Sequence, residues 1–144
     1  MTVQAVLDTS VLLYAIDTSP LHAKKRTQAR QLINTADWGL STQIAQEFYV
    51  NMLKGKVAAM TPAQASFALD RCLERECAGM DAATIQQAVR IHQRYQISYW
   101  DAAVIAAAVA LGAKVLYSED LNHGQIYDGV RVENPFQDLS AAAQ

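Results

Sequence analysis

The sequence has few cysteines, no excess of cationic residues and no long apolar run, and each shortage excludes a class of protein. Its 144 residues include only two cysteines, Cys72 and Cys77. Their spacing in or just after a predicted helix is poor for a disulfide, and no second pair completes a zinc site. A formal net charge of −2 argues against a protein that coats nucleic acid broadly, although a local basic patch remains compatible with it.

The apolar segments are too short for a membrane protein. The longest, residues 102–113, falls below the length that spans a bilayer. The amino-terminal segment has no basic leader, and Gln4 and Asp8 interrupt its apolar run. We therefore expect a cytoplasmic protein. Because residues 102–113 are apolar all round, they predict a helix buried inside the domain.

Strand and helix patterns alternate along the chain. Strands are predicted at 3–7, 38–41, 77–80, 114–117 and 130–132. Helices are predicted at 11–16, 22–36 and 102–111, and from residues 42, 62 and 81 onward. This order predicts an α/β fold of three layers, with a central, mostly parallel, twisted sheet of four to five short strands and helices on both faces. The length favours a single domain, which we place at 1–137, with a frayed tail at 138–144.

Four acidic residues stand where predicted strands end or helices begin. They are Asp8 in AVLDTSVLLYA, Glu47 in STQIAQEFYV, Asp101 in SYWDAAVIAAA and Asp120 in KVLYSEDLNHG. Ligands of parallel sheets bind beyond the carboxyl ends of the strands, so the four side chains can face one crevice. Carboxylates without a cluster of histidine or cysteine indicate a site for a hard cation such as Mg²⁺ or Mn²⁺.

Each acid also has a purely local explanation. Asp8 can cap the helix that follows it, and Glu47 can be a solvated helix residue. Asp101 ends the S-x-x-D pattern of a capping box that starts at Ser98. Asp120 lies in a polar turn. Taken singly no acid is convincing, but the recurrence at equivalent ends of successive elements favours a shared site.

Four segments of the chain together resemble a known family. They are LDTSVLLYA, STQIAQEFYVN, YWDAAVIAAA and LYSEDLNHGQIYDGVRVENPF. In this order and spacing they are similar to PIN-domain ribonucleases, and among those to the VapC-type toxins of toxin–antitoxin pairs. The resemblance extends from Val6 to about Phe136 and implies a PIN-like fold. It also implies an endoribonuclease that depends on one or two Mg²⁺ or Mn²⁺ ions.

The resemblance assigns metal-ligating or neighbouring roles to the four acids. Phosphodiester hydrolysis needs an activated water and positive charge near the phosphorus, and divalent ions held by carboxylates supply both. We expect Asp8 and Asp101 to be direct ligands, Glu47 to orient a water or accept its proton, and Asp120 to serve a second ion or an outer position.

Hydroxyl residues next to two of the acids are expected to support the site. The resemblance places a small hydroxyl residue at Thr9 or Ser10, after the first acid, and another at Ser118, before the last. Thr9 and Ser10 are expected to hold the Asp8 carboxylate or a ligand water. Glu119 is an additional acid, expected either to assist or to be exposed.

Basic residues cluster in the second predicted helix. Lys24, Lys25, Arg26 and Arg30 can form a wall of the crevice that contacts RNA phosphates. The alternative is an ordinary solvated helix face.

The resemblance also implies partners. VapC-type toxins form homodimers, cut transfer or ribosomal RNA at defined loops, and are inhibited by a small antitoxin that places a basic or aromatic side chain near the acids. The apolar helices at 44–53 and 65–73 are candidate protein–protein surfaces. Two alternatives stay open: a PIN nuclease of RNA processing without an antitoxin, and a non-catalytic binding module with a structural cation.

Overall fold

The computed structural model describes residues 2–55 and 60–142. The strands are β1 (Ala5–Leu7), β2 (Trp38–Ser41), β3 (Cys77–Ala78), β4 (Val115–Tyr117), β5 (Ile126–Tyr127) and β6 (Val130–Glu133). The α-helices are α1 (Thr9–Ile16), α2 (Ala23–Thr35), α3 (Thr42–Leu53), α4 (Pro62–Leu73), α5 (Ala82–Tyr95), α6 (Tyr99–Ala110) and α7 (Gln137–Ala142), and a short 3₁₀ turn, η1, covers Pro20–His22. This alternation follows the predicted order closely.

The strands form one sheet in the order β3-β2-β1-β4-β6-β5. Neighbours from β3 to β6 run parallel, and β5 pairs antiparallel with β6. The mostly parallel α/β sheet is therefore confirmed. The sequence predicts four to five strands, whereas the described residues hold six. The extra strand, β5, is two residues long and lacks an alternating pattern, although the Asp128-Gly129 pair that turns it into β6 has the positive φ angles of a tight hairpin.

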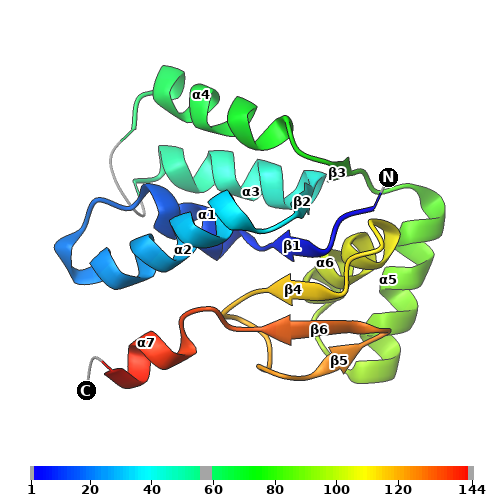
Figure 1. Cartoon of the computed structure of the whole chain (residues 1–144). Coiled ribbons are helices and arrows are strands. Elements are labelled where there is room, and N and C mark those ends of the chain that lie inside the picture. The colour runs from blue at the N-terminus through cyan, green and yellow to red at the C-terminus, as the bar shows by residue number, and fades with distance from the viewer. Residues whose placement is uncertain (1, 56–59, 143–144) are drawn as a thin grey trace.

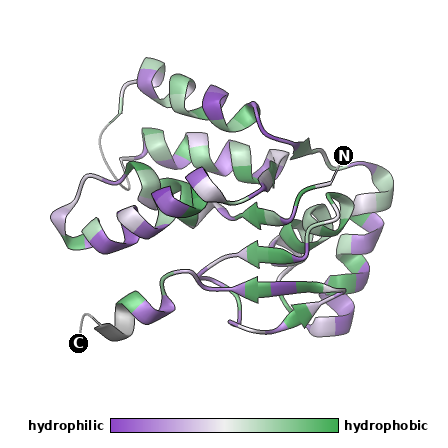
Figure 2. Ribbon diagram, in the orientation of Figure 1, coloured by the Kyte–Doolittle hydropathy of each residue, from purple (hydrophilic) through white to green (hydrophobic). Residues whose placement is uncertain are grey.

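Helices cover both faces of the sheet, which gives the three layers that the sequence predicts. Figure 1 shows α5 and α6 packed beside each other, while α1, α2, α3 and α4 form a second group. Residues Ala102–Ala108 of α6 are all buried, as the all-round apolar pattern predicts. In Figure 2, hydrophobic residues dominate β1 and β4, whereas hydrophilic and hydrophobic residues alternate along α5. The outer helix α5 thus covers α6 with one apolar side only.

Side-chain caps fix where the helices begin. Asp8 accepts from the Thr9 N–H at the start of α1, Ser41 caps α3, and Ser98 caps α6. The predicted capping box at Thr61 and the cap at Asp81 are both present. Each cap satisfies an N–H group that has no partner within its helix. The caps at Asp8 and Ser41 also set the points where β1 and β2 turn into helices.

The last described residues form the helix α7, where the sequence predicts a frayed tail. Phe136 is fully buried just before it, and Leu139 packs against the core. These apolar contacts anchor the first turn of α7 to the domain. The limits of the domain itself stay a prediction. No helix in residues 2–55 and 60–142 is long and apolar enough to cross a membrane.

A close approach between β2 and the chain before β3 gives a test of the sheet. A Cβ atom at Gly39 would lie 2.6 Å from the Glu76 carbonyl oxygen, which is a backbone atom and cannot move aside cheaply. We expect Gly39→Ala to lower the free energy of unfolding by about 1–3 kcal/mol, measured by chemical denaturation. Gly79→Ala is the matched control, because a Cβ there meets nothing within 4 Å. Equal stability of the two variants would contradict this packing.

Candidate functional site

Asp8 joins two neighbouring strands at their carboxyl ends. It directly follows β1, and the Thr9 N–H donates to its Oδ1 atom at 2.8 Å. The Ser118 hydroxyl, fully buried just after β4, donates to Oδ2 at 2.8 Å. Because β1 and β4 are paired, these contacts bring together two residues that are 110 positions apart in the sequence. Both carboxylate oxygens are therefore fixed in direction.

The surroundings of Asp8 favour its protonated form. Burial raises the pKa of Asp8 to about 6. The hydrogen bonds from Ser118 and Thr9 oppose this rise, and the negative charges of Asp120 and Glu47 add to it. A perturbed carboxyl group with other acids around it is typical of a functional site.

Glu47 approaches the same place from α3. Its Oε2 atom accepts from the Thr9 hydroxyl at 3.2 Å, and its Oε1 atom accepts from Gln43 Nε2 at 2.9 Å. Glu47 is exposed, so the two contacts fix its orientation and leave it open to solvent. Thr9 therefore links two acids, with its backbone N–H on Asp8 and its hydroxyl on Glu47.

Asp120 and Asp101 complete the acidic group. Asp120 lies in the turn after β4, and its N–H donates to the Ser118 hydroxyl at 3.2 Å. Partial burial raises the pKa of Asp120, and the charges of Glu119, Asp101 and Glu47 raise it further. Asp101 lies in the first turn of α6, where the Ser98 hydroxyl accepts from its N–H at 3.1 Å. That cap uses only the Asp101 backbone.

The four predicted acids are thus electrostatic neighbours. The charges of Asp120 and Glu47 raise the pKa of Asp8, and the charges of Asp101 and Glu47 raise the pKa of Asp120. However, within residues 2–55 and 60–142 no three His, Cys, Asp or Glu side chains are arranged closely enough to hold a metal ion. The group is an acidic cluster at one edge of the sheet whose charges influence one another.

The three predicted hydroxyl residues differ in their contacts. Ser118 contacts Asp8 directly, and Thr9 contacts Glu47 through its hydroxyl. The Ser10 hydroxyl is buried, and it has no hydrogen-bond partner in the part of the chain that the structure describes. The only side-chain hydroxyl among these residues that supports Asp8 is therefore that of Ser118. Thr9 supports Asp8 through its backbone N–H.

Glu119 is held by a lysine from α2. Lys25 Nζ lies 3.3 Å from Glu119 Oε2 and 3.2 Å from the Tyr14 hydroxyl, and 4.7 Å from the centre of the Tyr14 ring. Burial lowers the pKa of Lys25, but its contacts with Tyr14 and Glu119 outweigh this and raise it. A cation is therefore fixed to the residue that precedes Asp120.

The other predicted basic residues differ in their contacts. Arg26 Nη1 donates to the Asp17 carbonyl at 2.8 Å, and Arg30 Nε donates to the Ala15 carbonyl at 2.7 Å. These bonds satisfy carbonyl groups at the end of α1. Lys24 is exposed. The basic cluster thus contains two arginines that attach α2 to α1, beside two lysines.

Sequence reasoning overlooked Gln43 as a residue of the site. It lies one helical turn before Glu47 and donates both to Glu47 and, at 3.5 Å, to the Trp100 carbonyl. The available signal was the spacing of four residues between a glutamine and an acid on one helix, where side chains are neighbours.

The raised pKa of Asp8 gives a test in metal-free protein. The folded state binds this proton more tightly than the unfolded state, so the stability that Asp8 contributes falls as the pH rises from about 4 to 6. In chelator near pH 7.5, Asp8→Asn should therefore be more stable than the wild type by on the order of 2–3 kcal/mol, and should unfold at a higher temperature. Near pH 4 the two proteins should differ little.

Asp70→Asn, an exposed acid on α4, is the control and should change stability little at either pH. A difference between Asp8→Asn and wild type that does not depend on pH would exclude the proposed protonation of Asp8.

Comparison with known proteins identifies the family. The family model for the PIN domain matches residues 5–129. A search of curated proteins finds no match.

Solved structures share the fold at low sequence identity. A toxin–antitoxin complex from Klebsiella pneumoniae has a TM-score of 0.69 at 17% identity, covering 92% of this chain and 98% of that one. VapC20 of Mycobacterium tuberculosis, a sarcin-ricin loop cleaving toxin, has 0.66 at 17%, covering 89% and 99%. VapBC2 of Rickettsia felis, bound to promoter DNA, has 0.64 at 19%, covering 90% and 97%. The resemblance seen in the sequence is confirmed, and the chain belongs to the PIN-domain family.

Proposed function

We propose that the protein is a divalent-metal-dependent endoribonuclease and the toxin of a toxin–antitoxin pair. The observation that carries the proposal is Asp8, a carboxylate with a raised pKa that is fixed by Ser118 and has Asp120 and Glu47 near it, with Asp101 near Asp120. Such a group is unfavourable without a cation, because like charges in a partly buried site repel. Membership of the PIN-domain family supports the same conclusion.

The donor chemistry of the cluster fits Mg²⁺ or Mn²⁺. All the candidate ligands are carboxylate oxygens, which hard cations prefer. Asp8 and Asp101 are the residues we propose to hold one ion, with Asp120 beside them or at a second ion. When bound, the ion supplies positive charge for the phosphate and lowers the pKa of water.

The chain's own residues then orient the reaction. Thr9 and Gln43 fix the two oxygens of Glu47, so we propose that this exposed carboxylate positions the attacking water or accepts its proton. Ser118 keeps Asp8 in place by donating to Oδ2 and accepting from the Asp120 N–H.

RNA is the proposed substrate. Lys24, which is exposed, is the member of the basic cluster that we propose to contact phosphates, since Lys25 is paired with Glu119 and the two arginines already bind backbone carbonyls. A transfer or ribosomal RNA loop is the expected target, and one protein of similar fold is a sarcin-ricin loop cleaving toxin.

A nuclease assay tests the proposed activity. With Mg²⁺ or Mn²⁺, the wild type should cleave structured RNA, and chelator should stop the cleavage. Asp8→Asn and Asp101→Asn should each lower the cleavage rate by at least about a hundredfold, because each removes a charged ligand. Asp70→Asn should cleave like the wild type.

The same assay separates the proposal from a binding module with a structural cation. A structural cation would raise the melting temperature of the wild type without any metal-dependent cleavage. If RNA stays intact while Mg²⁺ stabilises the fold, the nuclease proposal is wrong.

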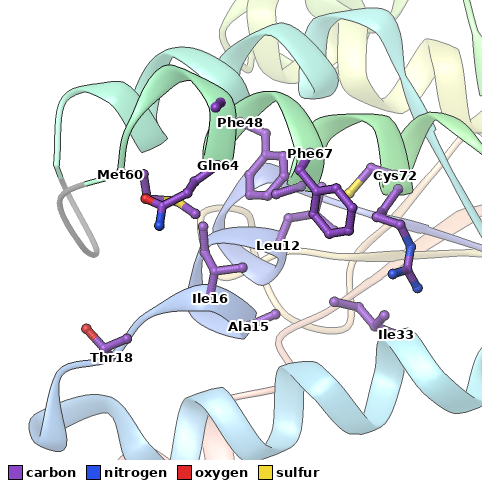
Figure 3. A pocket seen from close by; sticks show the side chains of 13 residues that line it. Leu12, Ala15, Ile16, Thr18, Ile33, Phe48, Met60, Gln64, Phe67 and Cys72 are labelled. Carbon is purple, nitrogen blue, oxygen red and sulfur yellow. The ribbon is translucent and has the colours of Figure 1, made fainter.

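An apolar groove is the proposed antitoxin site. It has a volume of about 790 Å³ and lies between α1, α2, α3 and α4. Figure 3 shows Leu12, Ile16, Phe48 and Phe67 around it. The groove runs beside α1, whose first residue, Thr9, contacts the acidic cluster. An apolar partner segment seated there can therefore carry a cationic side chain toward the acids.

A charge placed in the groove tests this partner. Phe67 is 66% exposed and lines the groove. A small protein captured from the source cells should inhibit cleavage by the wild type and by Phe67→Leu, but not by Phe67→Asp, because the carboxylate would be buried against an apolar segment. Ser66→Asp, an exposed neighbour outside the groove lining, is the control.

If no inhibitory protein is found, or if Phe67→Asp is inhibited as strongly as the wild type, the groove is not the antitoxin site. A nuclease of RNA processing without an antitoxin would then be the better description.

We also propose a homodimer through the outer face of α3 and α4. Val50, Leu53 and Leu73 are exposed there. A second hollow of about 500 Å³ lies on the same face, lined partly by Val50, Leu69 and Leu73. Contiguous exposed apolar side chains on two neighbouring helices favour a protein–protein contact.

A further inference from the structure

A third hollow adjoins the acidic cluster. It has a volume of about 470 Å³, and it is lined by residues of α3, α5 and α6 together with Met80. One of its lining residues is Glu47, which Thr9 ties to the cluster. The hollow and the acidic cluster therefore share a side chain.

An exposed tryptophan forms one wall of this hollow. Trp100 is 67% exposed, although an indole ring is usually mostly buried in a folded protein. It stands in the first turn of α6, directly before Asp101. Its ring meets the Tyr99 ring edge to face, with centroids 5.2 Å apart. This contact supports one side of the indole from within the protein.

Amide groups also line the hollow. Gln43 connects the Trp100 carbonyl to Glu47, and Gln46 is an exposed neighbour on α3. The hollow therefore combines an exposed aromatic ring with amide side chains. Unpaired nucleobases are recognised by such a combination, because aromatic rings stack on their faces and amides hydrogen-bond to their edges.

The charges around the hollow favour a nucleobase over a phosphate group as its ligand. The hollow is lined by one acid, Glu47, and by no lysine or arginine among its lining residues. Next to four acids, a phosphate gains little from the protein alone, whereas stacking on an aromatic ring is indifferent to these charges. Apolar Met80 and Ile85 also line the hollow, which suits the flat face of a base.

We propose that Trp100 is the stacking platform for an unpaired nucleobase next to the scissile phosphate, with Gln43 and Gln46 facing the edge of that base. This inference rests on the proposed ribonuclease function and adds a binding subsite to it. The hollow then selects single-stranded or splayed-out RNA, because a base inside a duplex cannot reach the indole.

Fluorescence tests the stacking directly. The chain has two tryptophans, and Trp38 is 3% exposed, so Trp38→Phe leaves Trp100 as the only indole. In chelator, which prevents cleavage, a short single-stranded RNA should quench Trp100 emission in this background, and a duplex of the same sequence should not. If single-stranded RNA binds without changing the emission, the platform is excluded.

Labelled RNA gives a second measurement that needs no change at Trp38. By fluorescence anisotropy in chelator, Trp100→Ala should weaken binding about tenfold, and Trp100→Phe should restore most of the loss. Ile126→Ala is the matched control, since Ile126 is a large apolar residue of similar exposure (59%) that is not among the residues lining the three hollows. Equal binding by Trp100→Ala and wild type would overturn the proposal.

Three outcomes separate this inference from its competitors. If Trp100→Ala changes the molar mass in light scattering from dimer to monomer, Trp100 contacts a second copy and the base site is wrong. If the RNA quenches Trp100 but metal never produces cleavage, the base site stands and the proposed nuclease function fails. If Trp100→Ala cleaves RNA as fast as the wild type at limiting RNA concentration, the base site is wrong and the proposed nuclease function stands.

Discussion

The contact between Ser118 and Asp8 is the constraint on which the rest of the site depends. It joins the residue after β4 to the residue after β1 and so needs these strands to be paired in one register. A buried hydroxyl that donates to one acid and accepts from the N–H of Asp120 leaves little freedom to either segment. Burial of a carboxylate is costly unless it is hydrogen-bonded. The fold therefore maintains an unfavourable charge with a small number of well-directed bonds.

The sheet and the buried helix α6 make this arrangement rigid. Small, apolar residues let α6 pack between the sheet and α5, with Ala102–Ala108 buried. Its first turn emerges from this packing with Asp101 and Trp100 on it. Residues on the first turn of a fully packed helix are placed more precisely than residues on a loop. The same element thus presents both a candidate metal ligand and a candidate base platform.

The acidic cluster and the proposed RNA substrate carry charge of the same sign, so the residues next to the acids cannot all bind RNA by charge. Lys25 stands at the edge of the cluster, fixed to Glu119 and Tyr14. Arg26 and Arg30 stabilise the junction of α1 and α2. Affinity next to the acids must then come from bound cations and from uncharged groups such as the Trp100 ring.

Much of the fold could be predicted, because local signals are strong in this chain. Apolar periodicity located most strands and helices, and the caps at Thr61 and Asp81 act as predicted. The strand β5 was missed because two residues carry no periodic signal, although Asp128-Gly129 marks the turn. The helix α7 was missed because its stability comes from Phe136 and Leu139, which pack against distant parts of the chain.

The sequence by itself determined the four acids, their positions at the ends of strands and helices, and the family to which they point. Only the tertiary structure decided how they are connected: Ser118 to Asp8, Thr9 and Gln43 to Glu47, and Lys25 to Glu119. It also decided that no three of the acids, within the described residues, come close enough together to hold a metal ion. The physical reason is that hydrogen bonds and pKa shifts depend on which segments meet in space and on how deeply they are buried. A spacing pattern along the chain contains neither.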